Sequence, residues 1–151
     1  MSMTVGERLA REFFERVWVP PHELDAIDEL MTPDYRITTA GQVIEGREAF
    51  KAWVADMQRV VGDATNAHLE VFTNGSGDRV VSRWVLHGVC QGRDVHLAGM
   101  TLSRVDEHGR MAEDWGFTDT FALLRELGLL RTIWLGLKVL TGRVKVPKAD
   151  A

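Results

Sequence analysis

Apolar positions in the first third of the chain follow the period of an α-helix. Between residues 5 and 18 they recur at steps of three and four, which places them on one helix face. The prolines at 20–21 end this pattern, and a short second helix is predicted over 24–31. A turn and a short strand follow over 32–41, and a longer apolar stripe predicts a helix over 46–61. The first part of the chain is therefore expected to be mostly helical.

Alternation of apolar and polar residues replaces the helical period in the second half of the chain. Four strands are predicted, over 66–73, 79–91, 94–105 and 110–121, with glycine-containing turns in the two hairpins. The helical period returns beyond the last strand, over 122–140. Helices followed by an antiparallel meander indicate an α+β fold, in which the helices cover one face of a curved sheet.

Composition narrows the classes of function. The 151 residues predict a single domain over 1–151, and the net charge of −4 gives no general basic surface for nucleic acid. Cys90 has no second cysteine to pair with, and the charged N-terminus lacks the apolar core of a signal peptide, so a cytoplasmic protein is expected. The longest apolar stretch, over 128–140, contains Arg131 and Lys138 and is too short for a membrane span.

Six short sequence features stand in a characteristic order. They are PDY at 33–35, a G-x-E-A-F helix start at 46–50, GDRVVSRW at 77–84, GRMAEDW at 109–115, an acid four residues after Trp115, and LLRELG at 123–128. In this order and spacing, over roughly residues 5–130, they resemble the SnoaL-like polyketide cyclases of the nuclear-transport-factor-2-like superfamily.

The resemblance implies a cone-shaped, curved antiparallel sheet wrapped on the N-terminal helices, with an extra C-terminal helix and a deep apolar pocket at the open end. In these cyclases the acid of the W-x-x-x-D motif is the catalytic acid/base, and Asp119 matches it. The superfamily includes isomerases, cyclases, dehydratases, epoxide hydrolases and proteins without catalytic activity, so the fold alone does not fix the reaction.

Alternation predicts which side chains share the pocket with Asp119. On the last strand, one face carries Glu113, Trp115, Phe117 and Asp119. On the central strand, one face carries Val81, Arg83, Val85, His87 and Val89. Burial is expected to raise the pKa of Asp119 and Arg83 to lower it, so that the acid exchanges a proton near neutral pH. A structural ion pair between these two residues is the alternative. The predicted catalytic set is Asp119, His87 and Arg83, and the facing of His96 stays open.

Further assignments concern substrate, metal and cofactor. The residues expected to contact substrate are Thr38, Trp53, Val85, Trp115 and Phe117. No metal site is predicted, because the histidines show no paired spacing such as H-x-H or H-E-x-x-H. No organic cofactor is predicted either, because NGSGD at 74–78 is a hairpin turn and lacks the strand-to-helix setting of a phosphate loop.

Departures from relatives narrow the expected chemistry. Ketosteroid isomerases carry a hydrogen-bonding tyrosine on the first helix, where this chain has Phe13 and Phe14. Limonene epoxide hydrolases use Arg-x-Asp on the central strand, where Arg83 is followed two residues later by Val85. The cyclases often show His or Asn in the strand after P-D, where this chain has Thr38 and Thr39, either of which is able to donate to a carbonyl oxygen.

The residues favour proton transfer next to a carbonyl of a small apolar substrate, polycyclic or polyketide-like. Asp119 is expected to move the proton, while Arg83 and His87 stabilise the enolate. Two alternatives stay open. One is water addition or elimination, including an epoxide hydrolase with an altered triad, and the other is a ligand-binding or interaction module without catalysis.

Two expectations concern partners. A homodimer is predicted through the outer face of the sheet, on which Trp84 and Leu86 are expected to lie opposite the pocket residues. The segment 128–151 carries five basic residues and one acidic residue, together with an apolar stripe. This basic amphipathic extension is expected to cap the pocket or pack on the partner subunit. Weak, reversible docking on an anionic membrane or on another protein is the alternative prediction.

Overall fold

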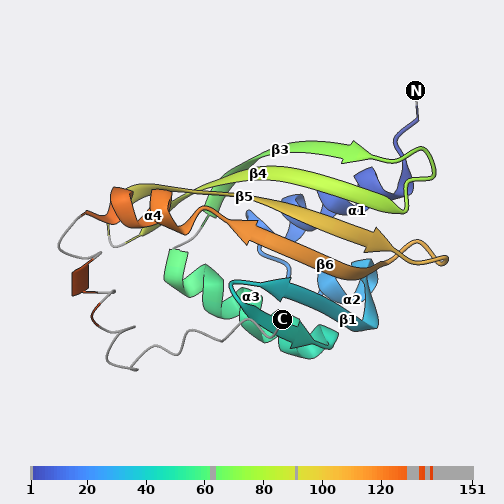
Figure 1. Cartoon of the computed structure of the whole chain (residues 1–151), viewed down its shortest axis with the longest axis horizontal. Helices are drawn as coiled ribbons and strands as arrows, with labels where there is room; N and C mark the ends of the chain where they lie inside the picture. The colour runs from blue at the N-terminus through green and yellow to red at the C-terminus, as the bar shows by residue number, and fades with distance from the viewer. Residues whose placement is uncertain (1, 62–63, 91, 129–132, 135–136, 138–151) are drawn as a thin grey trace.

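The computed structural model describes residues 2–61, 64–90, 92–128, 133–134 and 137. Within the described part of residues 2–128, four α-helices and one π-helical turn pack on one face and at one end of a six-stranded sheet (Figure 1). The helical elements are α1 (Val5–Phe13), η1 (Phe14–Trp18), α2 (Ala26–Leu30), α3 (Arg47–Val61) and α4 (Thr120–Leu127). The strands are β1 (Met31–Thr39), β2 (Gln42–Glu45), β3 (Ala64–Thr73), β4 (Arg79–Cys90), β5 (Arg93–Val105) and β6 (Met111–Thr118).

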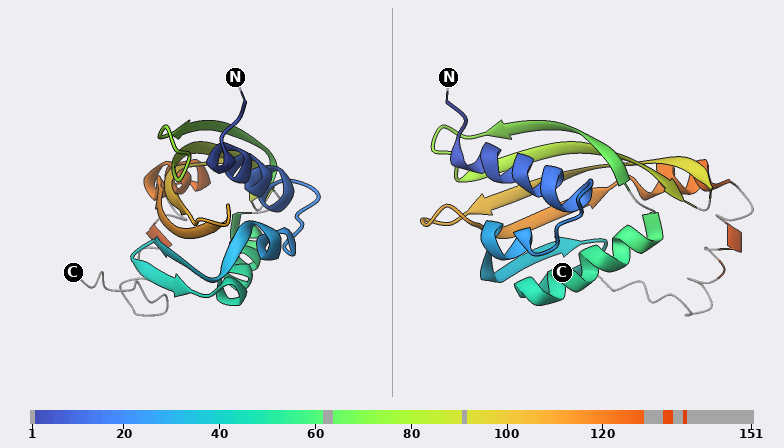
Figure 2. Two further views of the ribbon diagram at one scale, coloured as in Figure 1. Left: turned by 90° about the vertical axis from the view of Figure 1, so that its right-hand side faces the viewer. Right: turned by 180° about the vertical axis from the view of Figure 1, so that it is seen from behind.

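The sheet has the order β2-β1-β6-β5-β4-β3. Strands β3 to β6 form the expected antiparallel meander, whereas β1 pairs antiparallel with β2 and parallel with β6. The sheet curls around its concave side, and α1, α2 and α3 close the opening (Figure 2). Helix α4 follows the end of β6 and packs beside β5 (Figure 1). The fold is α+β, with helices covering one face of a curved sheet, as predicted.

The main differences between the observed and the predicted elements are at three places. Met31 begins β1 instead of ending a helix, and β2 was not predicted because it has only four residues. The last strand ends at Thr118, three residues earlier than expected. Asp119 explains this early end, since its side chain accepts a hydrogen bond from the backbone N–H of Ala122 at 3.0 Å and so caps the N-terminus of α4.

The first helix starts and ends for local reasons. The side chain of Thr4 accepts a hydrogen bond from the Glu7 backbone N–H at 3.2 Å, which caps α1. At its other end, the Val19 N–H bonds the Phe14 carbonyl five residues earlier, at 3.2 Å, which makes η1 a π-turn. Phe13, Phe14 and Trp18 are all buried and point toward the concave face of the sheet.

The concave face is formed by the set of alternating residues opposite to the predicted one. On β4 the residues packed inward are Val80, Ser82, Trp84 and Leu86, all buried. Their neighbours Val81, Arg83, Val85 and His87 are half-buried or exposed on the convex face. Alternation shows which residues share a face, but the helices decide which face is covered, and the ring of Phe14 packs 6.0 Å from that of Trp84. The prediction of which alternating set faces the pocket was therefore wrong, since the pocket set is shifted by one residue along the strand.

This shift also changes the predicted dimer contact. Trp84 and Leu86 line the concave side and are not available on the outer face. The convex face instead exposes Met100, Leu102 and Phe117. The homodimer stays a prediction.

The C-terminal extension lies mostly outside the described residues. Within it, Ile133, Trp134 and Leu137 are helical, and each is more than half exposed. No helix in the described ranges has the length and apolar character needed to span a lipid bilayer.

Candidate functional site

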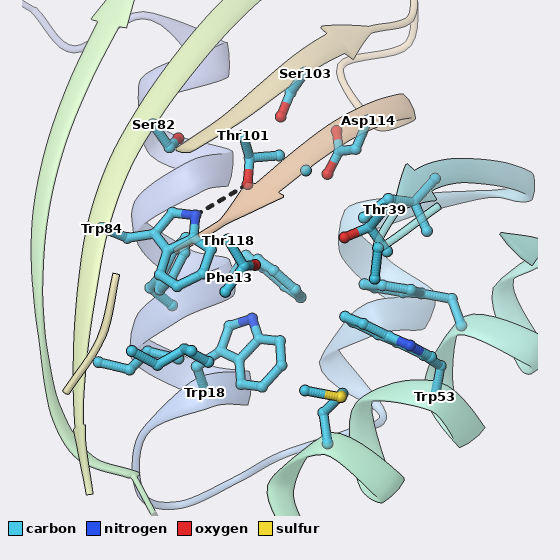
Figure 3. Close-up of a pocket in the computed structure, with 18 of the residues that line it drawn as sticks. Phe13, Trp18, Thr39, Trp53, Ser82, Trp84, Thr101, Ser103, Asp114 and Thr118 are labelled. Atoms are coloured by element: carbon cyan, nitrogen blue, oxygen red, sulfur yellow. Dashed lines mark hydrogen bonds between the residues drawn. The ribbon is translucent and has the colours of Figure 1, made fainter. Parts of the chain in front are cut away.

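A cavity of about 370 Å³ lies between the concave face of the sheet and the helices. Its size is within the usual range for small-molecule sites. The helices, with Trp84 from β4, supply aromatic walls (Figure 3). These aromatic residues are Phe13, Phe14, Trp18, Phe50, Trp53 and Trp84. At one end the cavity is lined by Thr120, Leu123 and Leu124 of α4.

The sheet supplies most of the polar groups of the cavity. Hydroxyl groups from four strands and one carboxyl group line this wall (Figure 3). They belong to Thr39, Ser82, Thr101, Ser103, Thr118 and Asp114. An apolar cavity with a few converging polar groups is the usual arrangement of a ligand site.

Asp114 is the one acidic residue among the described residues that line the cavity. It lies on β6, and only 3% of its surface is exposed. The hydroxyl of Tyr35, on the parallel neighbour β1, donates a hydrogen bond to Oδ2 of Asp114 at 2.7 Å. The other oxygen, Oδ1, has no hydrogen-bond partner among the described residues. Tyr35 therefore fixes one oxygen of Asp114, while the other, Oδ1, is buried without a hydrogen bond among the described residues, and the nearby hydroxyl of Ser103 lowers the pKa of the carboxyl group.

Burial dominates the protonation of this pair. It raises the pKa of Asp114 to about 6, and the hydroxyls of Tyr35 and Ser103 oppose that rise. Burial, followed by the charge of Asp114, raises the pKa of Tyr35 well above its usual range, so the tyrosine stays a donor. A carboxyl group with a pKa near 6 both gains and loses a proton easily close to neutral pH, as general acid/base catalysis requires.

A second polar contact orients a hydroxyl in the cavity. The indole Nε1 of Trp84 donates a hydrogen bond to Oγ1 of Thr101 at 3.0 Å (Figure 3). Trp84 therefore contributes both an apolar surface and a hydrogen bond. Its ring lies over Gly99, where a Cβ atom would come 2.4 Å from the indole.

The three residues predicted to be catalytic lie outside this cavity. Asp119 is exposed and caps α4. Arg83 is on the convex face, where it pairs with Glu70 at 2.7 Å. His87 is on the same face, and its ring lies 4.6 Å from that of His96, whose Nδ1 contacts Glu126 at 3.1 Å. The structure brings these three residues neither to the cavity nor into contact with one another, so their predicted shared placement was wrong.

The predicted substrate contacts divide in the same way. Trp53 lines the cavity, as predicted. Thr38, Val85, Trp115 and Phe117 do not, because each belongs to the convex set, and Phe117 is 70% exposed. Glu113, Val81 and Val89 also lie on the convex set and were wrongly placed.

Asp114 and Tyr35 were missed by the sequence analysis. A signal was present, because the alternation set that contains Asp114 also contains Ser103, Thr101 and Ser82 on the paired strands. A strand face that carries hydroxyl side chains and an acid is compatible with the wall of a polar-lined cavity and equally with a solvent-exposed face. The choice between the two faces needed the positions of the helices.

The described residues contain no group of three His, Cys, Asp or Glu side chains that could hold a metal ion. Asp114 is the single acid among the described residues that line the cavity, so no second carboxyl group is present there to share a metal ion. The polar groups that line the cavity are those expected to hold the oxygen atoms and move the protons of an organic ligand.

Comparison with known proteins agrees with this architecture. A family model described as SnoaL-like polyketide cyclase matches residues 8–127. IdmH of Streptomyces antibioticus, assigned as a polyketide cyclase, is 24% identical, with 82% of this chain and 99% of that chain covered and a TM-score of 0.69. A loop-truncation variant of IdmH is 26% identical, with 82% and 99% covered and a TM-score of 0.70.

A third solved structure has the same fold. It is a protein of Jannaschia sp. CCS1 assigned to the SnoaL-like polyketide cyclases, 24% identical, with 81% of this chain and 90% of that chain covered and a TM-score of 0.70. No curated protein matches the chain. The family match extends from α1 to the end of α4 and includes every element that lines the cavity. The chain therefore belongs to the SnoaL-like polyketide cyclase family, with the nuclear-transport-factor-2-like fold.

Proposed function

We propose that the protein catalyses proton transfer next to a carbonyl group of an apolar, polycyclic or polyketide-like substrate, as a cyclase or isomerase. One observation carries the proposal: a single carboxyl group, that of Asp114, is buried in an aromatic cavity with its pKa raised to about 6 and one oxygen unpaired. A carboxylate of this kind is a suitable general base for a weakly acidic C–H group. Family membership supports the same class of chemistry.

The reaction begins with Asp114 deprotonated. Oδ1 takes a proton from the carbon next to the carbonyl, the C–H electron pair forms a carbon–carbon double bond, and the carbonyl π pair moves to oxygen, giving an enolate. In an isomerase, Asp114 returns the proton to another carbon. In a cyclase, the enolate carbon attacks a second carbonyl carbon, and Asp114 gives its proton to the resulting alkoxide.

The surroundings of Asp114 favour this cycle. Tyr35 holds Oδ2 and so fixes the carboxylate plane, while its own raised pKa keeps its proton in place. The aromatic walls exclude water, which strengthens the interaction between the base and the bound substrate. Hydroxyl donors on the sheet stabilise the negative charge that forms on the substrate oxygen.

Exchange of protons for deuterium tests the proposal directly. The probe is 2-tetralone, a fused-ring ketone with acidic C–H groups next to its carbonyl, followed by NMR in D₂O. The wild type should accelerate the exchange, and the rate should rise with pH around a midpoint of about 6, because the base must be deprotonated. Asp114→Asn should lower the enzymatic rate by about 100- to 10,000-fold.

The matched control is Asp119→Asn, which makes the same chemical change on the same segment outside the cavity. It should exchange at the wild-type rate. An Asp114→Asn protein that exchanges as fast as the wild type would contradict the proposal. Binding of the ketone without any acceleration would instead assign a ligand-binding protein.

A further inference from the structure

One level of the concave sheet face combines a glycine with hydroxyl side chains on both sides. The strand register aligns Gly116 of β6 with Thr39 of β1 and with Thr101 of β5. All three residues line the cavity. A Cβ atom at Gly116 would lie 3.1 Å from Oγ1 of Thr39, so this hydroxyl borders the space that the absent side chain leaves. We call the space bordered by Thr39, Gly116 and Thr101 the glycine niche.

Thr101 is oriented as a hydrogen-bond donor. Its oxygen accepts the indole N–H of Trp84 at 3.0 Å, and an indole nitrogen only donates. The hydroxyl hydrogen of Thr101 is left to donate, and it has no acceptor within the part of the chain that the structure describes. The hydrogen bond from Trp84 therefore leaves the Thr101 hydroxyl hydrogen available to a ligand in the cavity.

Thr39 offers a second hydroxyl at the same niche. Its side chain is 6% exposed, lines the cavity and makes no hydrogen bond to any other described residue (Figure 3). The Thr39 oxygen is reachable from the cavity, so a ligand atom that accepts its hydrogen bond replaces a water molecule there. Thr39 and Thr101 lie on the strands on either side of Gly116, so an acceptor held over the glycine, such as a carbonyl oxygen, has a hydroxyl donor on each side.

The niche is adjacent to the proposed base. Asp114 lies two residues before Gly116 on β6, on the same face, and is aligned with Ser103. Its unpaired Oδ1 is therefore one level away along the sheet. We propose that Thr39 and Thr101 bind the carbonyl oxygen of the substrate in the glycine niche, which presents the neighbouring carbon to Asp114. This inference rests on the proposed function for the role of Asp114.

The lining also defines the class of substrate. No lysine, arginine or histidine is among the described residues that line the cavity. An anionic ligand would lose its hydration without gaining a cationic partner, and it would be repelled by the ionised carboxyl group of Asp114. The aromatic side chains favour a flat ring system. The substrate class is therefore a neutral, fused-ring ketone, and a carboxylate is excluded by charge.

The test compares two ligands that differ in one oxygen. The probes are 2-tetralone and tetralin, which has the same fused rings without the carbonyl, and binding is followed by tryptophan fluorescence. The wild type should prefer the ketone. Thr39→Val and Thr101→Val remove a hydroxyl at nearly constant shape and should each weaken ketone binding by about 5- to 10-fold, with tetralin binding unchanged.

A third variant tests the space, and a fourth serves as the control. Gly116→Ala places a methyl group in the niche and should reduce the preference for the ketone, with the melting temperature measured to confirm a folded protein. Thr38→Val removes the hydroxyl of the residue next to Thr39, on the convex side of β1 and outside the cavity, and should leave the preference unchanged. In the deuterium-exchange assay, Thr39→Val and Thr101→Val should lower the rate by more than they lower ketone binding, because bonds to an enolate are stronger than bonds to a ketone.

The outcomes separate this inference from the proposed function. If the wild type shows no preference for the ketone, the niche is overturned, even if Asp114→Asn abolishes exchange. The same holds if neither Thr39→Val nor Thr101→Val reduces the preference. A preference that falls in both variants supports the niche as a binding site even if Asp114→Asn exchanges normally. Naphthalene-2-carboxylate binding as tightly as 2-tetralone would overturn the assignment of a neutral substrate.

Discussion

The two faces of strand β4 carry a similar share of apolar side chains but have different roles. Val80, Trp84 and Leu86 on the concave face are buried under the helices, and two of them, Trp84 and Leu86, line the cavity. Val81 and Val85 on the convex face are only half-buried, beside the exposed Arg83. The difference shows that apolar character alone does not make a pocket wall. A wall forms where helices cover the sheet without filling the space.

The largest difference between the faces should appear on truncation of one side chain from each. Trp84→Ala removes the ring contact with Phe14 and the hydrogen bond to Thr101, and should lower the free energy of unfolding by about 3–5 kcal/mol. Val85→Ala, on the next residue, should cost less than about 1 kcal/mol. Urea denaturation measures both. Equal losses at the two positions would mean that the faces are equally covered.

A smaller difference should appear in the dependence of stability on pH. The pKa of Asp114 is raised from its ordinary value of 3.8 to about 6 in the folded protein, so folding favours the protonated carboxyl group. Its stabilising contribution is complete below pH 3.8 and is lost as the pH rises through about 6. The loss is on the order of 3 kcal/mol.

The difference in unfolding free energy between Asp114→Asn and the wild type isolates this effect from that of the other carboxyl groups. That difference should grow in favour of the variant between about pH 4 and pH 6 and then level off. Tyr35→Phe removes the hydrogen bond that lowers the pKa of Asp114, so it should move the midpoint to higher pH. A difference that is independent of pH would place Asp114 in a solvated environment, like that of the convex face.

The smallest effect is expected at the rim, where Asp119 caps α4. Asp119→Ala removes the acceptor for the Ala122 N–H and should lower the free energy of unfolding by about 1 kcal/mol. Asp119→Ser keeps an acceptor at this position and should retain most of the stability. Thermal unfolding measures both variants. An alanine variant as stable as the wild type would show that the cap does not hold α4 against the end of the cavity.

The sequence predicted the elements better than it predicted the site. The helical period at 5–18 and 46–61 and the alternation from 66 onward correspond to α1 with η1, α3, and strands β3 to β6. The choice of pocket face did not follow, because Val81 and Val85 alternate with Trp84 and Leu86 and both sets are apolar. The covering helices, which break this symmetry, are distant in the sequence.

The two aspartates show the same limit. The motif resemblance singled out Asp119, but its position after Thr118 makes it a helix cap, which is a local property of the backbone. The raised pKa of Asp114 depends on burial under distant elements and on Tyr35, separated from it by 79 residues. Periodicity within either segment carries no information about that contact.

The parallel pairing of β1 with β6 has a consequence for folding. Tyr35 and Thr39 reach Asp114 and Gly116 only through this pairing, which joins the first strand of the chain to the last. Contacts between such distant segments close long loops and form slowly compared with local hairpins. A folding intermediate that contains only the meander β3 to β6 would hold Asp114 without its tyrosine and would lack one wall of the glycine niche. Recovery of ketone binding during refolding therefore reports closure of the whole sheet, later than the appearance of strand structure.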